Sequence, residues 1–275
     1  MPIIETTRND IKNLKGLHLF HFAASNCSQR VRMVLEEKGV HWTSHHINLQ
    51  KYEHLSQEFQ ELNPKGVVPV LVHDGITITE SNDIITYVDE NFPGKSLQPT
   101  TEEGKEFLAE ALSRSSKIQD SLKVSSFEFL FKPVRKMNTD QLNHYEASVK
   151  NQYLVDFMRE FSSAEGFSQE KIRSSVSELV DIVSYLEDRL ASSQWLSGTA
   201  FGLADISWVV NIYRLRKMAF PFSDYPHVAR WLDAIAMRSS YKNAITKYES
   251  SKMKYFYSVY TTIRKLKGTS IASYI

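Results

Sequence analysis

The chain has 275 residues, and its 42% share of hydrophobic residues is enough for the core of one large domain or two of ordinary size. Its 33 basic and 32 acidic side chains leave a formal net charge of +1, which excludes a strong overall field for nucleic acid or for an anionic membrane. We therefore expect a neutral or small-molecule partner, and neither nucleic acid nor a membrane.

The single cysteine, Cys27, excludes an intrachain disulfide and argues against a secreted, disulfide-stapled fold. Residues 1–16 are rich in charge and lack the apolar run of a secretory signal. No uncharged stretch approaches the roughly 18 residues that a membrane span needs. The sequence thus predicts a cytoplasmic protein whose residues 1–16 form an N-terminal extension.

Residues 17–98 alternate between strand and helix patterns, which predicts an α/β domain. A polar elbow at residues 23–28 separates the first strand from the first helix, and Gly39 stands where the C-cap of that helix belongs. A second helix, capped by Ser81, stops at residues 91–94. In the order β-α-β, then β-β-α, the strands are expected at 17–22, 41–49, 67–72 and 76–79.

After residue 99 the composition changes, and residues 102–249 are compatible with helix almost throughout. This shift predicts a domain boundary near residues 95–104. We expect four segments after the extension: the α/β domain at 17–98, a linker at 99–104, an all-helical domain at 105–254 and a C-terminal tail at 255–275.

Pro69 interrupts the third strand, and proline lacks the N–H that a central strand donates. One interpretation is a cis Val68–Pro69 bond that turns the backbone of Val68 outward, where a peptide-like ligand can add as an antiparallel strand. The other interpretation is a strand that simply begins at Pro69.

Glu80 and Ser81 stand at the start of the second helix, where free N–H groups and the helix dipole favour an anion. Taken alone, Ser81 is explained as a helix cap. Together, the two side chains suit an amino-acid zwitterion, with its carboxylate on Ser81 and its ammonium near Glu80. The pair therefore predicts a site for an amino-acid group.

The elbow carries Ser25 and Cys27 close to the positive end of the first helix. A hydroxyl in this place can donate to a bound thiolate and, with the dipole, lower the pKa of the thiol from about 8.5 toward neutrality. The alternative is that serine only caps the helix and that Cys27 is a small buried filler.

Several motifs in this order resemble the glutathione transferase family. They are the elbow, Asn-Pro-Lys-Gly-Val-Val-Pro at 63–69, Glu-Ser-Asn-Asp-Ile-Ile at 80–85, and Gly-Leu-Ala-Asp-Ile-Ser at 202–207. The resemblance covers roughly residues 17–250. It implies a thioredoxin-like N-terminal domain with the order βαβ-ββα, an all-α C-terminal helical bundle, and glutathione as co-substrate.

The resemblance also implies roles for single residues. Ser25 stands where serine-type members carry the catalytic hydroxyl, and Cys27 matches a cysteine that takes part in catalysis in zeta-class isomerases and reductive dehalogenases. The glutathione binders would be the backbone of Val68 for the cysteinyl group, Pro69 as the family's cis-proline, Glu80 and Ser81 for the γ-glutamyl group, and His54 near the glycine carboxylate.

Three features depart from a single family pattern. Val67 stands where many members carry lysine or glutamine for the glycine carboxylate, and Gly202 replaces the usual serine or threonine cap. The extension at 127–167, which begins with the Phe-rich stretch 127–133, resembles the β-etherase branch, which cleaves aryl ethers with glutathione, whereas the elbow matches the zeta and dehalogenase type better. Most aromatic residues there are expected to be inter-helix core, and a minority to face an apolar substrate.

The resemblance thus implies a cytoplasmic, homodimeric detoxification enzyme whose glutathione thiolate attacks an apolar, aromatic electrophile. The alternatives within the family are aryl-ether cleavage, reductive dehalogenation and isomerisation. The alternative of another class is a non-catalytic ligand-binding or assembly protein. No metal site is expected, because His45 and His46 point to opposite faces of one strand and have no cysteine partner.

Overall fold

The computed structural model describes residues 3–6 and 8–275. By their contacts, the residues form two compact units, each of which combines separate stretches of the chain. The first unit comprises the described part of 1–112 together with 195–210 and 233–249, and the second comprises 113–194, 211–232 and 250–275. None of the helices in the described ranges is long and apolar enough to cross a membrane.

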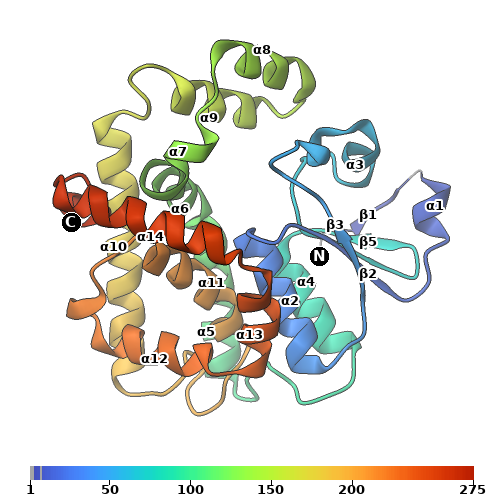
Figure 1. The fold of residues 1–275 in the computed structure, drawn as a ribbon. Coiled ribbons are helices and arrows are strands. Elements are labelled where there is room, and N and C mark those ends of the chain that lie inside the picture. Colours follow the sequence, from blue (N-terminus) through green and yellow to red (C-terminus); the bar gives the residue numbers. More distant parts are fainter. Residues whose placement is uncertain (1–2, 7) are drawn as a thin grey trace. The chain divides into compact units, whose positions relative to one another are not determined.

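A five-stranded mixed sheet lies at the centre of the first unit, in the order β1-β5-β4-β2-β3 (Figure 1). Strands β2 and β3 are parallel and every other pair is antiparallel. The strands are β1 (Ile3–Ile4), β2 (Leu17–His21), β3 (Thr43–His46), β4 (Val70–His73) and β5 (Ile76–Ile78).

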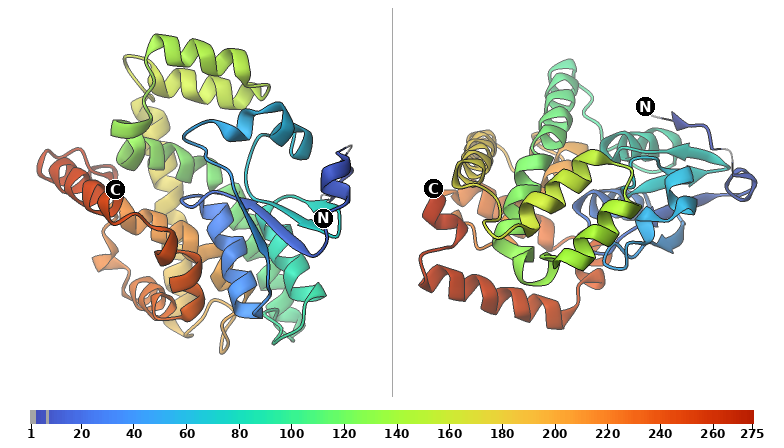
Figure 2. Two further views of the ribbon diagram at one scale, coloured as in Figure 1. Left: turned by 45° about the vertical axis from the view of Figure 1, so that its right-hand side comes forward. Right: turned by 90° about the horizontal axis from the view of Figure 1, so that it is seen from above.

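Two helices, α2 (Asn26–Lys38) and α4 (Ser81–Asn91), pack against each other on one face of this sheet, and α3 (Gln57–Leu62) lies on the other (Figures 1 and 2). The α/β arrangement predicted for this part of the chain is confirmed. Gly39 adopts the left-handed conformation at the end of α2, with φ of 63°, and its N–H donates to carbonyls of the last turn. The predicted C-cap is therefore confirmed.

Several predicted boundaries were wrong. The strand expected at 41–49 is only β3, and the strand expected at 67–72 begins at Val70, after a cis Val68–Pro69 bond. Ser81 is the first residue inside α4, and Glu80 occupies the N-cap position with φ of 63° and no capping side-chain bond. Propensity favours serine at a cap, but the backbone turn at Glu80 moves the helix start by one residue.

Residues of the N-terminal stretch join the core of the first unit. Ile3 and Ile4 pair with β5, and the short helix α1 (Asn9–Lys12) buries Ile11 among Val70 and Val72. A Cβ on Gly75 would lie 2.3 Å from the carbonyl oxygen of Lys12, and Gly75 also has φ of 83°. The turn between β4 and β5 therefore requires glycine.

The second half of the chain is helical, which confirms the predicted helical bundle. Its first helices are α5 (Glu102–Lys117), α6 (Gln119–Ser126), the π-helical segment η2 (Phe127–Phe131), α7 (Lys132–Arg135), α8 (Thr139–Ser148) and α9 (Gln152–Ser162). They are followed by α10 (Gln169–Ala191), α11 (Leu203–Lys217), α12 (Pro226–Ala236), α13 (Ser239–Ala244) and α14 (Ser251–Leu266). Short 3-10 turns complete the chain at η1 (Glu53–Leu55), η3 (Phe222–Asp224), η4 (Thr246–Tyr248) and η5 (Ile271–Tyr274).

The start of α11 explains Gly202, which looked like a missing cap. Asp205 accepts hydrogen bonds from the backbone N–H groups of Gly202 and Leu196, at 3.0 and 2.9 Å. A Cβ on Gly202 would lie 2.5 Å from the carbonyl oxygen of Leu97, which itself accepts from the N–H of Leu203. Close approach of two backbones, rather than loss of a cap, accounts for this glycine.

Gly202→Ser should therefore destabilise the protein, although it restores the serine that the family pattern favours. We expect a loss of about 1–3 kcal/mol in the free energy of unfolding, since the new side chain meets backbone that must shift. Urea unfolding measures this loss. An unchanged or raised stability would mean that the contact with Leu97 is not what selects glycine.

Candidate functional site

The elbow after β2 carries Ser25 at the N-cap of α2. The Ser25 Oγ accepts from the backbone N–H of Ser28 at 3.3 Å, and the Ser28 Oγ accepts from the N–H of Phe22 at 3.3 Å. The capping interpretation is thus correct for Ser25. The cap uses the hydroxyl only as an acceptor, and a hydroxyl that accepts one hydrogen bond still has a hydrogen to donate. Ser25 and Cys27 are both half-buried.

A buried arginine, Arg32, binds the backbone of this elbow. Its guanidinium donates to the carbonyls of Phe22 at 3.2 Å, Ala23 at 2.9 Å and Ala244 at 2.7 Å. It also lies 4.1 Å from the ring centre of Tyr248. Burial lowers the pKa of Arg32 to about 10, so the group stays charged at neutral pH.

His21 at the end of β2 completes the support of the elbow. Its Nδ1 lies 3.0 Å from the Arg32 guanidinium, which can only donate, so Nδ1 accepts and the ring proton sits on Nε2. Nε2 then donates to the Ser44 Oγ at 2.8 Å. Burial, and secondarily the charge of Arg32, lowers the pKa of His21 to about 3. The ring is therefore neutral under physiological conditions.

The neutral state of His21 predicts a pH dependence of stability. Below pH 6.5 the unfolded chain takes up a proton on this side chain, whereas the folded protein does so only near pH 3. The unfolded state then binds more protons, so the free energy of unfolding decreases as the pH is lowered, by at most about 1.4 kcal/mol per pH unit. Between pH 7 and 5 we expect a loss of about 2 kcal/mol from this group.

His21→Asn provides the comparison, because an amide oxygen still accepts from Arg32 and does not titrate. Urea unfolding at several pH values should show the stability gap between the two proteins narrowing from pH 7 to pH 5. A constant gap would contradict a buried, neutral His21.

Val68 lies two residues before β4 and contributes its side chain to the core. Its backbone N–H and C=O form no hydrogen bond with any residue in the described ranges. The bond to Pro69 is cis, as the first of the two sequence interpretations expected, and Pro69 is buried. Val68 thus offers an N–H and a C=O that the described chain does not use for hydrogen bonding.

Glu80 and Ser81 have partners that the sequence analysis missed. Lys65 forms an exposed ion pair with the Glu80 carboxylate at 2.5 Å. Arg30 donates from Nη1 to the Ser81 Oγ at 2.7 Å, and from Nε and Nη2 to the carbonyl of Ser207 at 3.2 and 2.9 Å. The buried Arg30 and the exposed pair of Glu80 and Lys65 thus lie at the same helix start.

Arg30 is fully buried and forms no ion pair with a carboxylate in the described part of the chain. Burial lowers the pKa of its guanidinium, and the nearby Cys27 acts in the opposite direction. The sequence contained a signal for this, since Arg30 sits in a helix with no acidic residue three or four positions away on either side.

His54 lies in η1, which stands between the elbow and Val68 in the sequence. It is buried, and its ring centre is 6.4 Å from that of Tyr52. The carbonyl of His54 is 3.5 Å from the position of a Cβ on Gly66, so η1 packs on the loop that leads to Val68. The structure thus places His54 beside this loop through its backbone.

The Phe-rich stretch in the second unit forms an aromatic cluster. The ring centre of Phe127 lies 4.9 Å from that of Phe157 and 5.0 Å from that of Phe161. Phe157, Phe161 and Phe167 are buried, as expected for inter-helix core. The ammonium of Lys123 lies 4.1 Å from the ring centre of Phe157, and burial lowers the pKa of Lys123 to about 8.

Comparison with known proteins identifies the fold. Residues 19–96 match the model of the glutathione S-transferase N-terminal domain, and residues 162–234 match that of the C-terminal domain. LigF from a Sphingobium strain is 28% identical over 84% of this chain and 93% of its own length. Glutathione S-transferase 1 of Dianthus caryophyllus is 46% identical, but that match spans only 30% of this chain and 38% of that protein.

Solved structures agree. The crystal structure of the beta-etherase LigF matches with a TM-score of 0.76 and 27% identity, over 84% of this chain and 99% of that chain. A theta-class enzyme of Xanthomonas axonopodis with glutathione bound matches with a TM-score of 0.66 and 18% identity, over 84% and 98% of the two chains, which shows a shared fold. With both domain models matched in order, the chain belongs to the glutathione S-transferase family and is a transferase that uses glutathione as co-substrate.

Proposed function

We propose that the enzyme activates the thiol of glutathione at Ser25 and transfers the thiolate to an apolar, aromatic electrophile. The observation that carries this proposal is the buried Arg30, which has no carboxylate partner in the described residues and donates to the Ser81 hydroxyl at 2.7 Å. A buried positive charge of this kind favours an anion at the same helix start.

The γ-glutamyl end of glutathione supplies such an anion. Its α-carboxylate would accept from the Ser81 hydroxyl and from the first N–H groups of α4, with Arg30 behind Ser81 as a positioning residue. Its ammonium would bind the Glu80 carboxylate in place of Lys65. Exchange of an exposed ion pair for another costs little, because such pairs contribute only about 0–1 kcal/mol.

The cysteinyl residue would pair with Val68. Its N–H and C=O match the C=O and N–H of Val68, which have no partner in the described chain, and form two antiparallel strand bonds. The glycine carboxylate would lie toward His54, as the family resemblance implies. Val67 offers no polar group there, so we expect the glycine end to contribute least to affinity.

Ser25 would act on the sulfur. Its hydroxyl donates to the thiolate, and the positive end of α2 adds to the stabilisation. The thiol proton passes to solvent, the thiolate forms a C–S bond to the electrophilic carbon, and the leaving group departs with the electron pair of the broken bond. Cys27 plays no part in this step and is expected to pack at the elbow.

Aryl-ether cleavage is the specific reaction that the likeness to LigF favours. LigF, a beta-etherase, aligns over 93% of its own length and has a TM-score of 0.76 to this chain. In such a reaction the thiolate would form a thioether with the ether carbon and release a phenolate, which takes a proton from water. Reductive dehalogenation and isomerisation are the alternatives that a substrate screen separates.

Calorimetric titration with glutathione tests the binding site. Ser81→Ala and Glu80→Gln should each raise the Kd at least about tenfold, because the first removes a hydrogen bond to the carboxylate and the second removes the negative charge opposite the ammonium. Asp83→Asn, in the same first turn of α4, is the matched control and should leave the Kd unchanged. Equal affinity in all four proteins would refute the γ-glutamyl assignment.

A substrate screen tests the chemistry. We expect turnover of aryl halides or of aryl ethers with a fluorescent phenol as leaving group. Binding of glutathione without any turnover would favour the non-catalytic alternative. We also propose that the enzyme is a cytoplasmic homodimer that acts in detoxification, as the family suggests, and light scattering on the purified protein determines the oligomeric state.

A further inference from the structure

The near-zero net charge of the chain conceals a strongly basic C-terminal segment. Residues 250–275 contain five of the 33 basic side chains and none of the 32 acidic ones. Most of this segment is the helix α14, which carries Lys252 and Lys254 in its first turn and Arg264 and Lys265 in its last. Lys267 follows at its C-cap.

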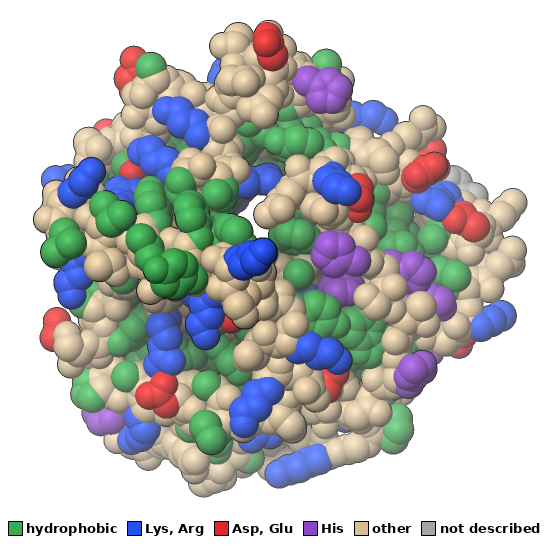
Figure 3. Space-filling view, viewed as in Figure 1, with side chains coloured by type: hydrophobic (Ala, Val, Ile, Leu, Met, Phe, Trp, Pro, Cys, Tyr) green, Lys and Arg blue, Asp and Glu red, His purple; other side chains and the backbone are tan. Residues whose placement is uncertain are grey.

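A stripe of apolar side chains runs along α14 and faces solvent. At about 100° per residue, its members fall within roughly 100° of arc on the helix. The stripe consists of Tyr255, Phe256, Val259, Ile263 and Leu266, with exposed fractions of 74%, 40%, 41%, 45% and 83%. Figure 3 shows apolar side chains gathered over α14 with basic side chains around them. Contiguous exposed apolar side chains of this kind mark interaction surfaces.

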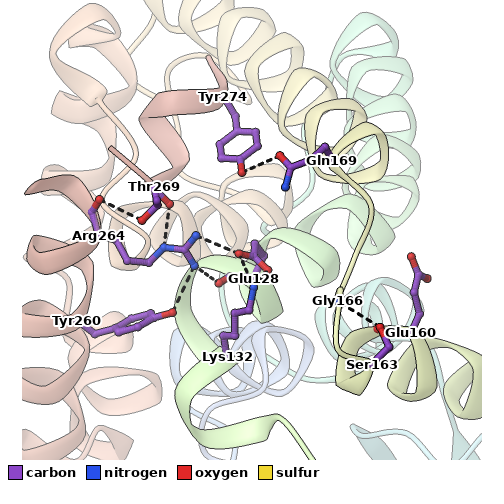
Figure 4. A network of polar contacts seen from close by, with 10 residues as sticks. All are labelled: Glu128, Lys132, Glu160, Ser163, Gly166, Gln169, Tyr260, Arg264, Thr269 and Tyr274. Carbon is purple, nitrogen blue, oxygen red and sulfur yellow. Dashed lines mark hydrogen bonds and ion pairs between the residues drawn. The ribbon is translucent and has the colours of Figure 1, made fainter. Parts of the chain in front are cut away.

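The helix is nevertheless fixed to the second unit by its other face (Figure 4). Arg264 donates to the carboxylate of the buried Glu128 at 3.0 Å, and also to its backbone carbonyl. Lys132 binds the same carboxylate at 2.7 Å. After the helix, Ile271 is fully buried and the Tyr274 hydroxyl bonds to Gln169 at 3.1 Å. The exposed stripe is therefore held rigidly and is not a frayed end.

The charges along the stripe decide what kind of partner fits it. Lys252 lies within its arc at the start of the helix, and Lys267 borders it at the end, so both long side chains can extend past an apolar boundary toward anions. Glu128 compensates Arg264, but no acidic residue of the segment compensates the lysines. Two such surfaces would repel each other, which disfavours a second copy of the chain.

We propose that α14 docks on the surface of an anionic lipid bilayer. The stripe inserts at the level of the headgroups and the lysines contact lipid phosphates, in the manner of helices that lie in the plane of the interface. Apolar insertion and charge attraction act together in this arrangement. Binding therefore needs both the exposed apolar side chains and the lysines.

Sedimentation with lipid vesicles tests the proposal on the full chain. The vesicles are pure phosphatidylcholine or a three-to-one mixture of phosphatidylcholine and phosphatidylglycerol. We expect binding to the mixed vesicles only, with a marked fall between about 0.1 M and about 1 M salt, as the Debye length drops from about 10 to about 3 Å.

Variants separate the two contributions. The double variant Tyr255→Ser with Leu266→Ser removes the two most exposed apolar side chains and should lower the partition coefficient at least about tenfold. Met237→Ser is the matched control, since Met237 is 73% exposed outside this helix. Lys252→Gln with Lys267→Gln should weaken binding similarly, whereas Lys242→Gln with Lys247→Gln should not. Thermal unfolding verifies that each variant is folded.

Three results would overturn the proposal. Equal binding to neutral and anionic vesicles would contradict charge complementarity. Binding that the α14 variants leave unchanged would place the contact elsewhere. Absence of vesicle binding together with self-association that the Tyr255 and Leu266 variant abolishes would show that the stripe is an interface between copies.

Discussion

Replacing Ser25 by alanine should lower kcat about 10²–10³-fold while the Kd for glutathione changes little. An effect of this size on kcat is typical when one hydrogen-bond donor to a negative charge is removed from a site sheltered from water. Affinity is retained because Val68, Glu80 and Ser81 provide the proposed contacts along the peptide. Stopped-flow or steady-state kinetics with an aryl halide, beside calorimetry, measures the two constants separately.

Controls must separate this effect from helix capping, because Ser25 also accepts from the N–H of Ser28. Ser56 caps α3 in the same way, with its Oγ accepting from Phe59 at 3.2 Å. Ser56→Ala should cost about 1 kcal/mol of stability, as Ser25→Ala does, without loss of turnover. If Ser25→Ala keeps full activity and Cys27→Ala loses it, a cysteine-based thiol transfer replaces the serine mechanism.

Replacing Asp89 by alanine should have the largest effect on stability, about 3–5 kcal/mol. The side chains of Asp89 and Lys38 are each 1% exposed and form an ion pair at 3.0 Å between α4 and α2. Asp89 also accepts from the backbone N–H of Leu97 at 3.0 Å. The variant leaves a buried ammonium without its carboxylate and an amide without its acceptor. Urea unfolding measures the loss.

The double variant Asp89→Ala with Lys38→Met should recover part of this stability, because no uncompensated charge remains buried. Glu102→Ala removes a comparable pair with Lys105 that is exposed at 84% and 53%, and should cost less than about 1 kcal/mol. A loss below about 1 kcal/mol for Asp89→Ala itself would mean that water reaches Lys38.

Local signals in the sequence predicted much of the fold. The apolar run after residue 17, the polar elbow, and Gly39 each specify their own backbone, so β2, α2 and its C-cap could be predicted from neighbouring residues. The proline at position 69 likewise marked a break in the predicted third strand, and β4 begins directly after it. The predicted boundaries of some elements were wrong. At α4, for example, Glu80 has φ of 63°, a conformation that glutamate does not prefer, and this turn moved the start of the helix.

The supports of the site could not be predicted, because they join residues far apart in the chain. Arg30 bonds to Ser81 and Ser207, which lie 51 and 177 positions away, and Arg32 bonds to Ala244, 212 positions away. The sequence contained only one indication of these contacts, because Arg30 has no acidic residue three or four positions away, whereas Arg32 has Glu36 four positions along the helix. Gly202 was misjudged for the same reason, because Leu97 is its neighbour in space alone.

A titration of the thiol of bound glutathione tests the central claim most directly. The ultraviolet absorbance of the thiolate, followed against pH in the complex, gives the pKa of that thiol. We predict a pKa at least about one unit below the ordinary thiol value of about 8.5 in the wild type, and a return toward that value in Ser25→Ala. Saturated binding with an unshifted pKa, or the same shift without the Ser25 hydroxyl, would contradict it.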